Sequence, residues 1–169
     1  EADGAKIKYI FLTHFHADFV SGQYDLAQKT GAKIVFGPNA TAEYDIYNGA
    51  DGEEFFVGGG KITLIHTPGH TMESSSYLIT DKDGKTPCVL TGDALFIGDV
   101  GRPDLAVKQG ALTELDLAGH LFDSLRNKIM KLPDDIIVYP NHGAGSACGK
   151  NMSTDTFDTL GNQKKTNYA

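Results

Sequence analysis

The sequence has few cysteines and no long apolar run. Only Cys88 and Cys148 occur among its 169 residues, which is too few for the disulfide framework of a small secreted protein. No apolar stretch approaches the roughly 20 residues that a membrane-spanning helix needs. We therefore expect a protein without a membrane segment that resides in the cytoplasm.

Basic side chains are also scarce. The chain carries 15 Lys and Arg against 22 Asp and Glu, for a formal net charge of −7, and its basic residues form no cluster beyond Lys164 and Lys165. A nucleic-acid-binding face gathers basic residues along the phosphate backbone. We therefore expect no nucleic-acid partner. The 40% of hydrophobic residues are spread along the chain, which favours one globular domain over residues 1–169.

Short apolar runs alternate with helical patterns. Strands are predicted over residues 6–13, 33–36, 55–57, 62–65, 75–80, 88–91 and 136–139, with a hairpin at the glycine triplet 58–60. Helices are predicted over residues 21–29, ending at Gly31, and over residues 112–129, and Ser153 is expected to cap a last short helix. This alternation indicates an α/β architecture.

Histidines and aspartates follow four of these strands directly. His14, His16 and Asp18 follow the first strand, His70 follows the strand 62–65, Asp93 follows the strand 88–91, and His142 follows the strand 136–139. Loops at strand ends of α/β sheets are where ligands collect. Imidazole and carboxylate groups bind Zn, Fe or Mn, so the pattern predicts a metal site. His66 and His120, by contrast, are expected to belong to the scaffold.

The motifs around these residues resemble those of the metallo-β-lactamase superfamily. They are His14-Phe15-His16-Ala17-Asp18, Thr67-Pro68-Gly69-His70-Thr71, Gly92-Asp93 and Tyr139-Pro140-Asn141-His142-Gly143. Residues 91–105 resemble the persulfide dioxygenase branch, and residues 143–168 resemble members that continue into rhodanese domains. The resemblance implies an αββα sandwich. Because a complete domain of that family has several strands before its first metal loop, much of the N-terminal sheet is expected to be missing, and the truncated chain is expected to self-associate or form a homo-oligomer.

Two positions depart from the family pattern. The superfamily motif continues with a second-metal His after the Asp of the first loop, whereas this chain has Phe19, whose phenyl ring cannot coordinate a metal. One ion per chain is therefore predicted rather than two. After His142, residues 143–149 differ from the Tyr-containing sequence of glutathione-type persulfide dioxygenases, which leaves the thiol carrier open.

Within the dioxygenase branch, the resemblance implies that His14, His70 and Asp93 bind one Fe(II), with Zn as the alternative metal. The implied reaction oxidises the terminal sulfur of a low-molecular-weight thiol persulfide to sulfite with O₂. His16, Asp18 and His142 would then orient ligands, position water or accept protons. Arg102 and Asp104 would either brace the metal loop or bind the anionic part of the substrate, and Cys148 is a possible sulfur-carrying thiol.

Two other functions remain open. The first is a zinc hydrolase of the glyoxalase II type, which cleaves thioesters through a metal-bound hydroxide; Phe19 and the segment 99–105 count against it. The second is a non-catalytic metal-binding domain that serves a fused or separate rhodanese. An intact set of ligands disfavours this second reading.

Overall fold

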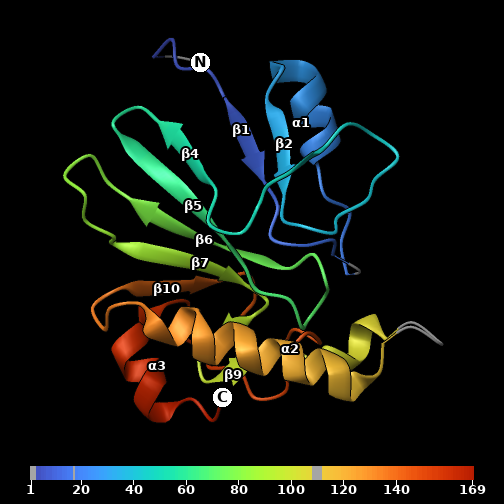
Figure 1. Cartoon of the computed structure of the whole chain (residues 1–169), viewed down its shortest axis with the longest axis vertical. Helices are drawn as coiled ribbons and strands as arrows, with labels where there is room; N and C mark the ends of the chain where they lie inside the picture. Colours follow the sequence, from blue (N-terminus) through green and yellow to red (C-terminus); the bar gives the residue numbers. More distant parts are fainter. Residues whose placement is uncertain (1–2, 17, 108–111) are drawn as a thin grey trace.

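The computed structural model describes residues 3–16, 18–107 and 112–169 (Figure 1). Two β-sheets face each other, and helices cover their outer sides (Figure 1). The first sheet has three parallel strands in the order β1-β2-β3: β1 (Tyr9–Phe11), β2 (Lys33–Phe36) and β3 (Tyr47–Asn48). Helix α1 (Gln23–Thr30) covers its outer face and ends at Gly31 in a left-handed conformation with φ 71°, as predicted.

The second sheet has six strands in the order β11-β10-β7-β6-β5-β4. They are β4 (Glu54–Val57), β5 (Gly60–His66), β6 (Ser75–Thr80), β7 (Cys88–Gly92), β10 (Ile137–Pro140) and β11 (Asp158–Thr159). Strands β8 (Leu95–Phe96) and β9 (Asp99–Val100) form a separate hairpin. Helices α2 (Glu114–Asn127) and α3 (Leu160–Thr166) cover the outer face, with 3₁₀ turns at Pro103–Ala106 and Ile129–Lys131 (Figure 1).

Three apolar clusters hold these four layers together. Ile34 and Phe36 pack toward Ala27 of α1 on the outer side of the first sheet. Between the sheets lie Val35, Phe55, Leu64 and Tyr77, with Tyr9 and Phe11 against them. The largest cluster joins the second sheet to its helices through Val89, Leu121, Leu125, Ile129, Val138 and Leu160. The predicted αββα sandwich is therefore confirmed.

Several predicted boundaries shift. Strands 33–36 and 75–80 are observed as predicted, but the strand expected over residues 6–13 is only Tyr9–Phe11. The expectation for Ser153 is wrong, because its hydroxyl accepts from Asp155 N in a turn at 3.1 Å, whereas Thr159 caps α3 by accepting from Asn162 N. Helix α2 starts at a capping box, in which Thr113 and Asp116 satisfy each other's backbone N–H groups.

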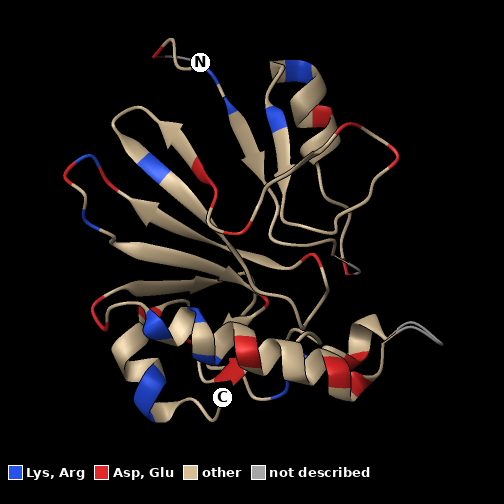
Figure 2. Cartoon of the chain, viewed as in Figure 1, with Lys and Arg blue, Asp and Glu red and all other residues tan. Residues whose placement is uncertain are grey.

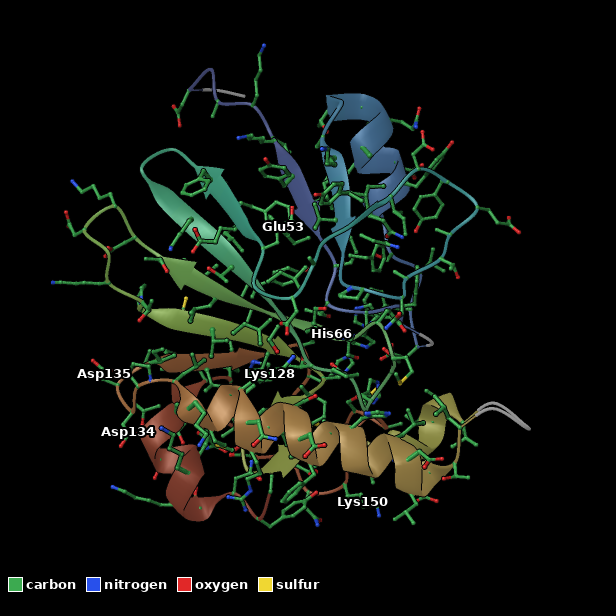
Figure 3. All side chains as sticks on the ribbon, viewed as in Figure 1. Glu53, His66, Lys128, Asp134, Asp135 and Lys150 are labelled. Carbon is green, nitrogen blue, oxygen red and sulfur yellow. The ribbon has the colours of Figure 1, made fainter. Side chains whose placement is uncertain are left out.

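The C-terminal end of α2 is tied to the second sheet by Lys128. Its Nζ donates to the carbonyl of His66 at 2.6 Å and to Asp51 Oδ2 at 2.8 Å; Figure 3 labels Lys128 and His66. His66 also turns its ring to the Met72 carbonyl, with Nε2 at 2.9 Å, so it belongs to the scaffold, as predicted. Lys and Arg are spread over several elements in Figure 2 rather than gathered on one of them.

Candidate metal centre

The four predicted loops meet at one end of the sandwich. Strand β6 is antiparallel to β5 and to β7, and β10 is parallel to β7, so β5, β7 and β10 point the same way and end at the same edge. His70, Asp93 and His142 follow these ends. His14 comes from β1 in the opposite sheet, so the site lies where the two sheets converge. Ala17, within the first loop, is outside the described residues.

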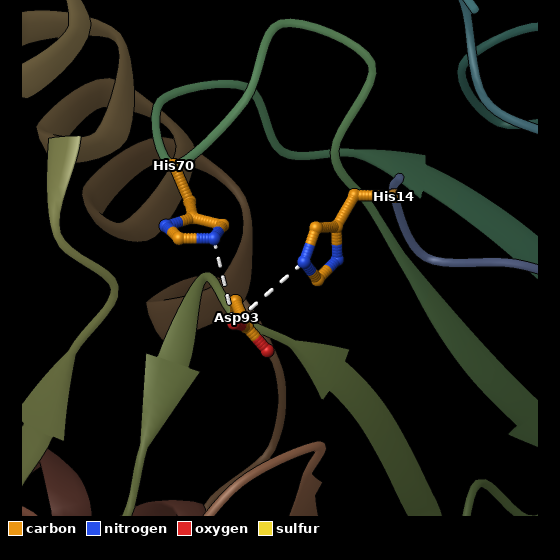
Figure 4. Close-up of side chains that lie close together, drawn as sticks. All are labelled: His14, His70 and Asp93. Carbon is orange, nitrogen blue, oxygen red and sulfur yellow. Dashed lines mark ion pairs between the residues drawn. The ribbon is translucent and has the colours of Figure 1, made fainter. Parts of the chain in front are cut away.

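His14, His70 and Asp93 form a buried cluster. Their exposed fractions are 2%, 4% and 1%. The Nε2 atoms of His14 and His70 lie 3.6 and 3.4 Å from Asp93 Oδ2, and the two imidazole rings are nearly perpendicular (Figure 4). Two imidazole nitrogens thus approach one carboxylate oxygen from different directions. The structure thus brings together the three residues that the resemblance implies as metal ligands, with their ligand atoms within 4.8 Å of one another.

The far side of each imidazole has a hydrogen-bond partner. His70 Nδ1 lies 2.9 Å from the carbonyl oxygen of Arg102, and His14 Nδ1 lies 2.9 Å from Thr13 Oγ1. Asn141 Nδ2 donates to the same Thr13 oxygen at 2.8 Å. An acceptor at Nδ1 holds the proton there and leaves the Nε2 lone pair free for a metal. These contacts therefore orient both Nε2 atoms toward Asp93.

Asp93 differs from the two imidazoles in this respect. Among the residues that the structure describes, neither carboxylate oxygen of Asp93 has a hydrogen-bond donor, although both are buried. A buried carboxylate left unpaired is costly in free energy. Two inward imidazole nitrogens and an orphaned carboxylate fit a divalent cation of the Fe or Zn type. The residues present therefore fit a metal ion.

The electrostatics of the site favour neutral imidazoles at His14 and His16. Burial, together with the charges that the neighbouring His16, His70 and His142 would carry, lowers the pKa of His14 to about 2. Burial also lowers the pKa of His16, although Asp93 and Asp18 oppose the shift. Because a metal binds the unprotonated ring, His14 needs no proton loss at neutral pH to serve as a ligand.

The loop that carries His70 packs directly on α2. Gly69 has φ 145°, and a Cβ at that position would lie 2.4–2.5 Å from Leu121 atoms, two of them backbone. Only glycine fits this close approach. In addition, Ser124 Oγ donates to the Pro68 carbonyl at 2.8 Å. Helix α2 therefore fixes the position of the loop that carries His70.

His16, Asp18 and His142 form a second group beside the first. His142 Nε2 lies 3.3 Å from Asp18 Oδ2, and His16 Nδ1 lies 3.9 Å from Asp18 Oδ1. The Phe19 ring is half-exposed and stands 4.2 Å from the His16 ring, centroid to centroid. These residues line a cleft of about 500 Å³ together with Phe11, Leu12, Thr13 and Asn141. The cleft borders the buried cluster at His142, whose Nδ1 lies 3.1 Å from Asp93 Oδ2.

Arg102 and Asp104 pair with each other. Arg102 Nε donates to Asp104 Oδ1 at 3.0 Å, and Arg102 Nη2 donates to Oδ2 at 2.5 Å. Arg102 Nη1 also donates to the Ala147 carbonyl, while its backbone N–H donates to the Cys148 carbonyl. These contacts connect the Arg102 loop to residues 147 and 148.

Cys148 lies against Asp93, with 8% of its surface exposed. Burial raises the pKa of its thiol, and the charge of Asp93 acts in the same direction, although Ser146 opposes the shift. The lowered pKa that would mark a reactive thiolate is therefore not found in the metal-free chain. Cys88, in β7, also has its pKa raised by burial.

Sequence reasoning missed the residues that support this site. Asp99 accepts from the backbone N–H groups of Lys150 and Asn151 at 2.6 Å each, and from Tyr168 Oη at 2.6 Å. It thereby anchors the loop that carries Cys148. Its partners are 51 to 69 residues away in the chain, so no local pattern signals them. Thr13 and Asn141, in contrast, stand beside predicted ligands within the motifs.

Comparison with known proteins decides the family. A sequence model described as the metallo-beta-lactamase superfamily matches residues 1–142. The chain belongs to the metallo-beta-lactamase superfamily. Members of this superfamily are largely metal-dependent enzymes, in agreement with the ligand cluster described above.

Individual relatives point in two directions. The chain is 32% identical over 149 residues to a probable hydroxyacylglutathione hydrolase of Schizosaccharomyces pombe, covering 88% of this chain and 53% of that protein. A metallo-beta-lactamase structure from Staphylococcus aureus aligns with TM-score 0.85 at 35% identity, covering 99% and 50% of the two chains. ETHE1 from Myxococcus xanthus aligns with TM-score 0.77 at 30% identity, covering 99% and 64%. The chain thus spans about half to two thirds of the length of these relatives.

Within the described part of the chain, no helix has the length and apolar character required to cross a membrane.

Proposed function

We propose that this superfamily member is a mononuclear persulfide dioxygenase-like enzyme. It would oxidise the terminal sulfur of a low-molecular-weight thiol persulfide to sulfite with O₂. The observation that carries the proposal is the buried two-histidine, one-carboxylate cluster of His14, His70 and Asp93. Residues 91–105, which resemble the persulfide dioxygenase branch, contain Asp93, and the likeness to ETHE1 supports this branch.

The three residues would hold one Fe(II). When bound there, the metal would supply O₂ binding and redox chemistry, since three protein ligands leave other coordination positions open. Thr13 and the Arg102 carbonyl keep the two imidazoles oriented, as their contacts to Nδ1 of His14 and His70 show. Bracing of this kind is typical around metal ligands.

His16, Asp18 and His142 would move protons and position water at the cleft. The Asp18 side chain is 44% exposed, whereas that of His142 is 14% exposed, so the pair connects solvent to the buried cluster. His142 presents Nε2 to Asp18 and Nδ1 to Asp93, at 3.3 and 3.1 Å. A histidine placed between two carboxylates can pass a proton from one side to the other.

Three further residues would support the metal centre or carry sulfur beside it: Arg102, Asp104 and Cys148. The Arg102–Asp104 pair holds the loop over residues 147–148 and, through the Arg102 carbonyl, the His70 ring. We assign Arg102 and Asp104 as positioning residues. Cys148 lies beside the cluster, where its thiol would take the outer sulfur of a persulfide as a Cys148 persulfide, with the S–S bond of the substrate broken and the parent thiol released. A fused or separate rhodanese would then be a natural partner, as the resemblance of residues 143–168 implies.

A zinc hydrolase of the glyoxalase II type is the second candidate. It is favoured by the likeness to a probable hydroxyacylglutathione hydrolase and by the group His16, Asp18 and His142, which lie close enough to hold a second ion. A hydrolase would use a metal-activated water on a thioester. Phe19 stands where the superfamily motif has a further ligand, and this weakens the second site.

Metal content and substrate turnover separate the two functions. The chain would be purified without oxygen from cells supplied with iron and zinc, and tested for O₂ uptake with persulfides and for cleavage of glutathione thioesters. We expect about one iron per chain and sulfite formation in step with O₂ uptake. Asp93→Asn should abolish both, and His120→Asn, on the exposed side of α2, should change neither. Two zinc ions, no iron and thioester cleavage would overturn the proposal in favour of the hydrolase.

A further inference from the structure

The first metal loop leaves the first sheet but is fastened to the second. Tyr77 Oη donates to the Leu12 carbonyl at 2.7 Å, and the Ser75 N–H donates to the Thr13 carbonyl at 2.8 Å. Both donors belong to β6 of the second sheet, whereas their acceptors follow β1 of the first sheet. The chain is therefore held across the sandwich directly before His14.

Glu73 supplies a third contact, which comes directly after His14. Its Oε1 accepts from the backbone N–H of Phe15 at 3.1 Å. A hydrogen bond to an ionised carboxylate is roughly twice as strong as a bond between neutral groups. Glu73 itself stands three residues after His70 in the sequence. Its side chain therefore connects the loop that carries His14 to the loop that carries His70.

We propose that Glu73 is a positioning residue, which fixes the His14 imidazole relative to that of His70. The Phe15 N–H belongs to the planar peptide group that joins His14 to Phe15, so holding it also fixes the direction of the His14 backbone. The two imidazole rings meet edge to face, with centroids 5.0 Å apart (Figure 4). The inference rests on the metal-ligand roles proposed above for these two histidines, but it applies to oxidation and to hydrolysis alike.

Both partners of this hydrogen bond are themselves held in place. Ser75 Oγ donates to the Glu73 carbonyl at 3.2 Å. Gly37, which follows β2, lies against the same two residues, since a Cβ there would stand 1.8 Å from Ser75 Oγ and 2.9 Å from the Glu73 carbonyl oxygen. The Phe15 ring stacks on Phe36, with centroids 4.3 Å apart. The support of His14 is therefore built before a metal binds, as a preorganised site requires.

The affinity of Glu73 variants for Zn²⁺, measured by competition with a chelator, tests this inference. Glu73→Ala should lower the affinity by about 10- to 100-fold, because the loop beyond His14 loses its support. Glu73→Gln keeps an acceptor for the Phe15 N–H and should stay within about threefold of the wild type. Equal affinities in the wild type and in Glu73→Ala would overturn the inference.

Glu53→Ala is the matched control. Glu53 Oε2 also accepts from a backbone N–H, that of Ala50 at 2.8 Å, but it does so directly before β4, the edge strand of the second sheet. This variant should bind Zn²⁺ as the wild type does. A cobalt spectrum then separates positioning from stability, because the visible bands of bound Co²⁺ report the geometry of its ligands. Glu73→Ala should shift these bands and Glu73→Gln should restore them, whereas an unshifted spectrum in Glu73→Ala would contradict the inference.

Amide hydrogen exchange of the metal-free chain gives a test that needs no metal. In the wild type, the Phe15 N–H should exchange at least about tenfold more slowly than in an unfolded peptide, a measurement that stands even where Glu73→Ala does not fold. In a folded Glu73→Ala this protection should be lost. An unprotected Phe15 N–H in the wild type, or full protection in Glu73→Ala, would overturn the inference. A wild type that binds no metal would instead overturn the proposed function, and the exchange of Phe15 would still decide whether Glu73 holds the loop.

Discussion

Gly101 and Asp93 approach each other so closely that no side chain fits between them. A Cβ on Gly101 would lie 1.8 Å from the Asp93 carbonyl oxygen and 3.1 Å from His70 Cβ. Two of the proposed metal ligands therefore rest against one glycine. Contacts of this kind leave no room for adjustment in a close-packed interior.

Gly101→Ala should therefore weaken metal binding, because Asp93 must move away from the two imidazoles. We expect metal affinity to fall by about 10- to 100-fold, the range found when the support of metal ligands is disturbed, measured by competition with a chelator. Gly119→Ala is the control. Its Cβ meets nothing within 4 Å on α2, and it should stabilise the helix by about 0.5–1 kcal/mol. Unchanged affinity in Gly101→Ala would show that the loop relaxes freely.

Asp93→Asn should have opposite effects on the metal-free and metal-loaded protein. Its buried oxygens have no donors within the described structure, so the neutral amide should raise the free energy of unfolding of the metal-free chain by about 1–3 kcal/mol. The increase in melting temperature that metal gives the wild type should disappear. Thermal unfolding with and without chelator measures both. Asp123→Asn, on the exposed face of α2, should leave both values as in the wild type.

Phe19→His should create a second site for a hard ion. The Phe19 ring lies 4.2 Å from the His16 ring, so an imidazole there would add a ligand to His16, Asp18 and His142. We expect binding of Mn²⁺, which avoids thiolate, to rise from one to about two ions per chain by calorimetry. Phe19→Leu should bind as the wild type does. If the wild type already takes two Mn²⁺ ions, the argument from Phe19 is wrong.

Asp99→Asn should destabilise the chain in a pH-dependent way. Burial raises the pKa of Asp99, but the hydrogen bonds from Tyr168 and from the backbone of Asn151, Val100 and Lys150 outweigh it and hold the pKa below its usual value. Its stabilising contribution is therefore present above the unfolded-state pKa of about 4 and is lost as the pH falls below it. We expect a loss of about 2–4 kcal/mol at pH 7 that shrinks below pH 4.

Urea unfolding at several pH values measures this effect. Asp83→Asn, in an exposed turn, serves as the control and should give a difference within about 0.5 kcal/mol at every pH. A loss for Asp99→Asn that stays constant down to pH 3 would show that packing, rather than charge, carries the contribution of Asp99.

The uncovered end of the second sheet should drive self-association. Leu64, Tyr77, Leu90 and Tyr139 are successive partners across β5, β6, β7 and β10, so they share one face. The first two are buried beneath the first sheet, whereas Leu90 and Tyr139 are 37% and 41% exposed, and the Tyr139 ring lies 5.7 Å from that of Phe157. Apolar patches of this kind promote association.

Sedimentation velocity over a range of concentrations should show oligomers of the wild-type chain. The double variant Leu90→Lys, Tyr139→Lys should shift the chain toward monomer. Leu115→Lys, at a residue 82% exposed on α2, is the matched control and should not. A monodisperse wild-type monomer at all concentrations would contradict the prediction.

The sequence by itself determined where most strands lie and the order of the candidate ligands along the chain. Residues 33–36 and 75–80 form strands as predicted, because short apolar runs bounded by turn residues have a strong local preference. Gly31 ends α1 because few other residues adopt its left-handed conformation. The prediction that Ser153 caps a helix was wrong because residues that cap helices also form turns. The strand-end pattern marked six candidate metal residues, and the resemblance to the superfamily implied that His14, His70 and Asp93 among them bind the metal.

Tertiary structure decided how these residues meet. His14 comes from a different sheet than His70 and Asp93, and only the facing of the two sheets brings its ring to the Asp93 carboxylate. Asp99 holds the Cys148 loop through partners more than 50 residues away, and Gly101 touches Asp93 through a close approach of two backbones. The burial of Asp93 to 1% exposure, without a hydrogen-bond donor among the described residues, also results from tertiary packing. Such contacts arise from packing over long sequence separations, which local pattern does not encode.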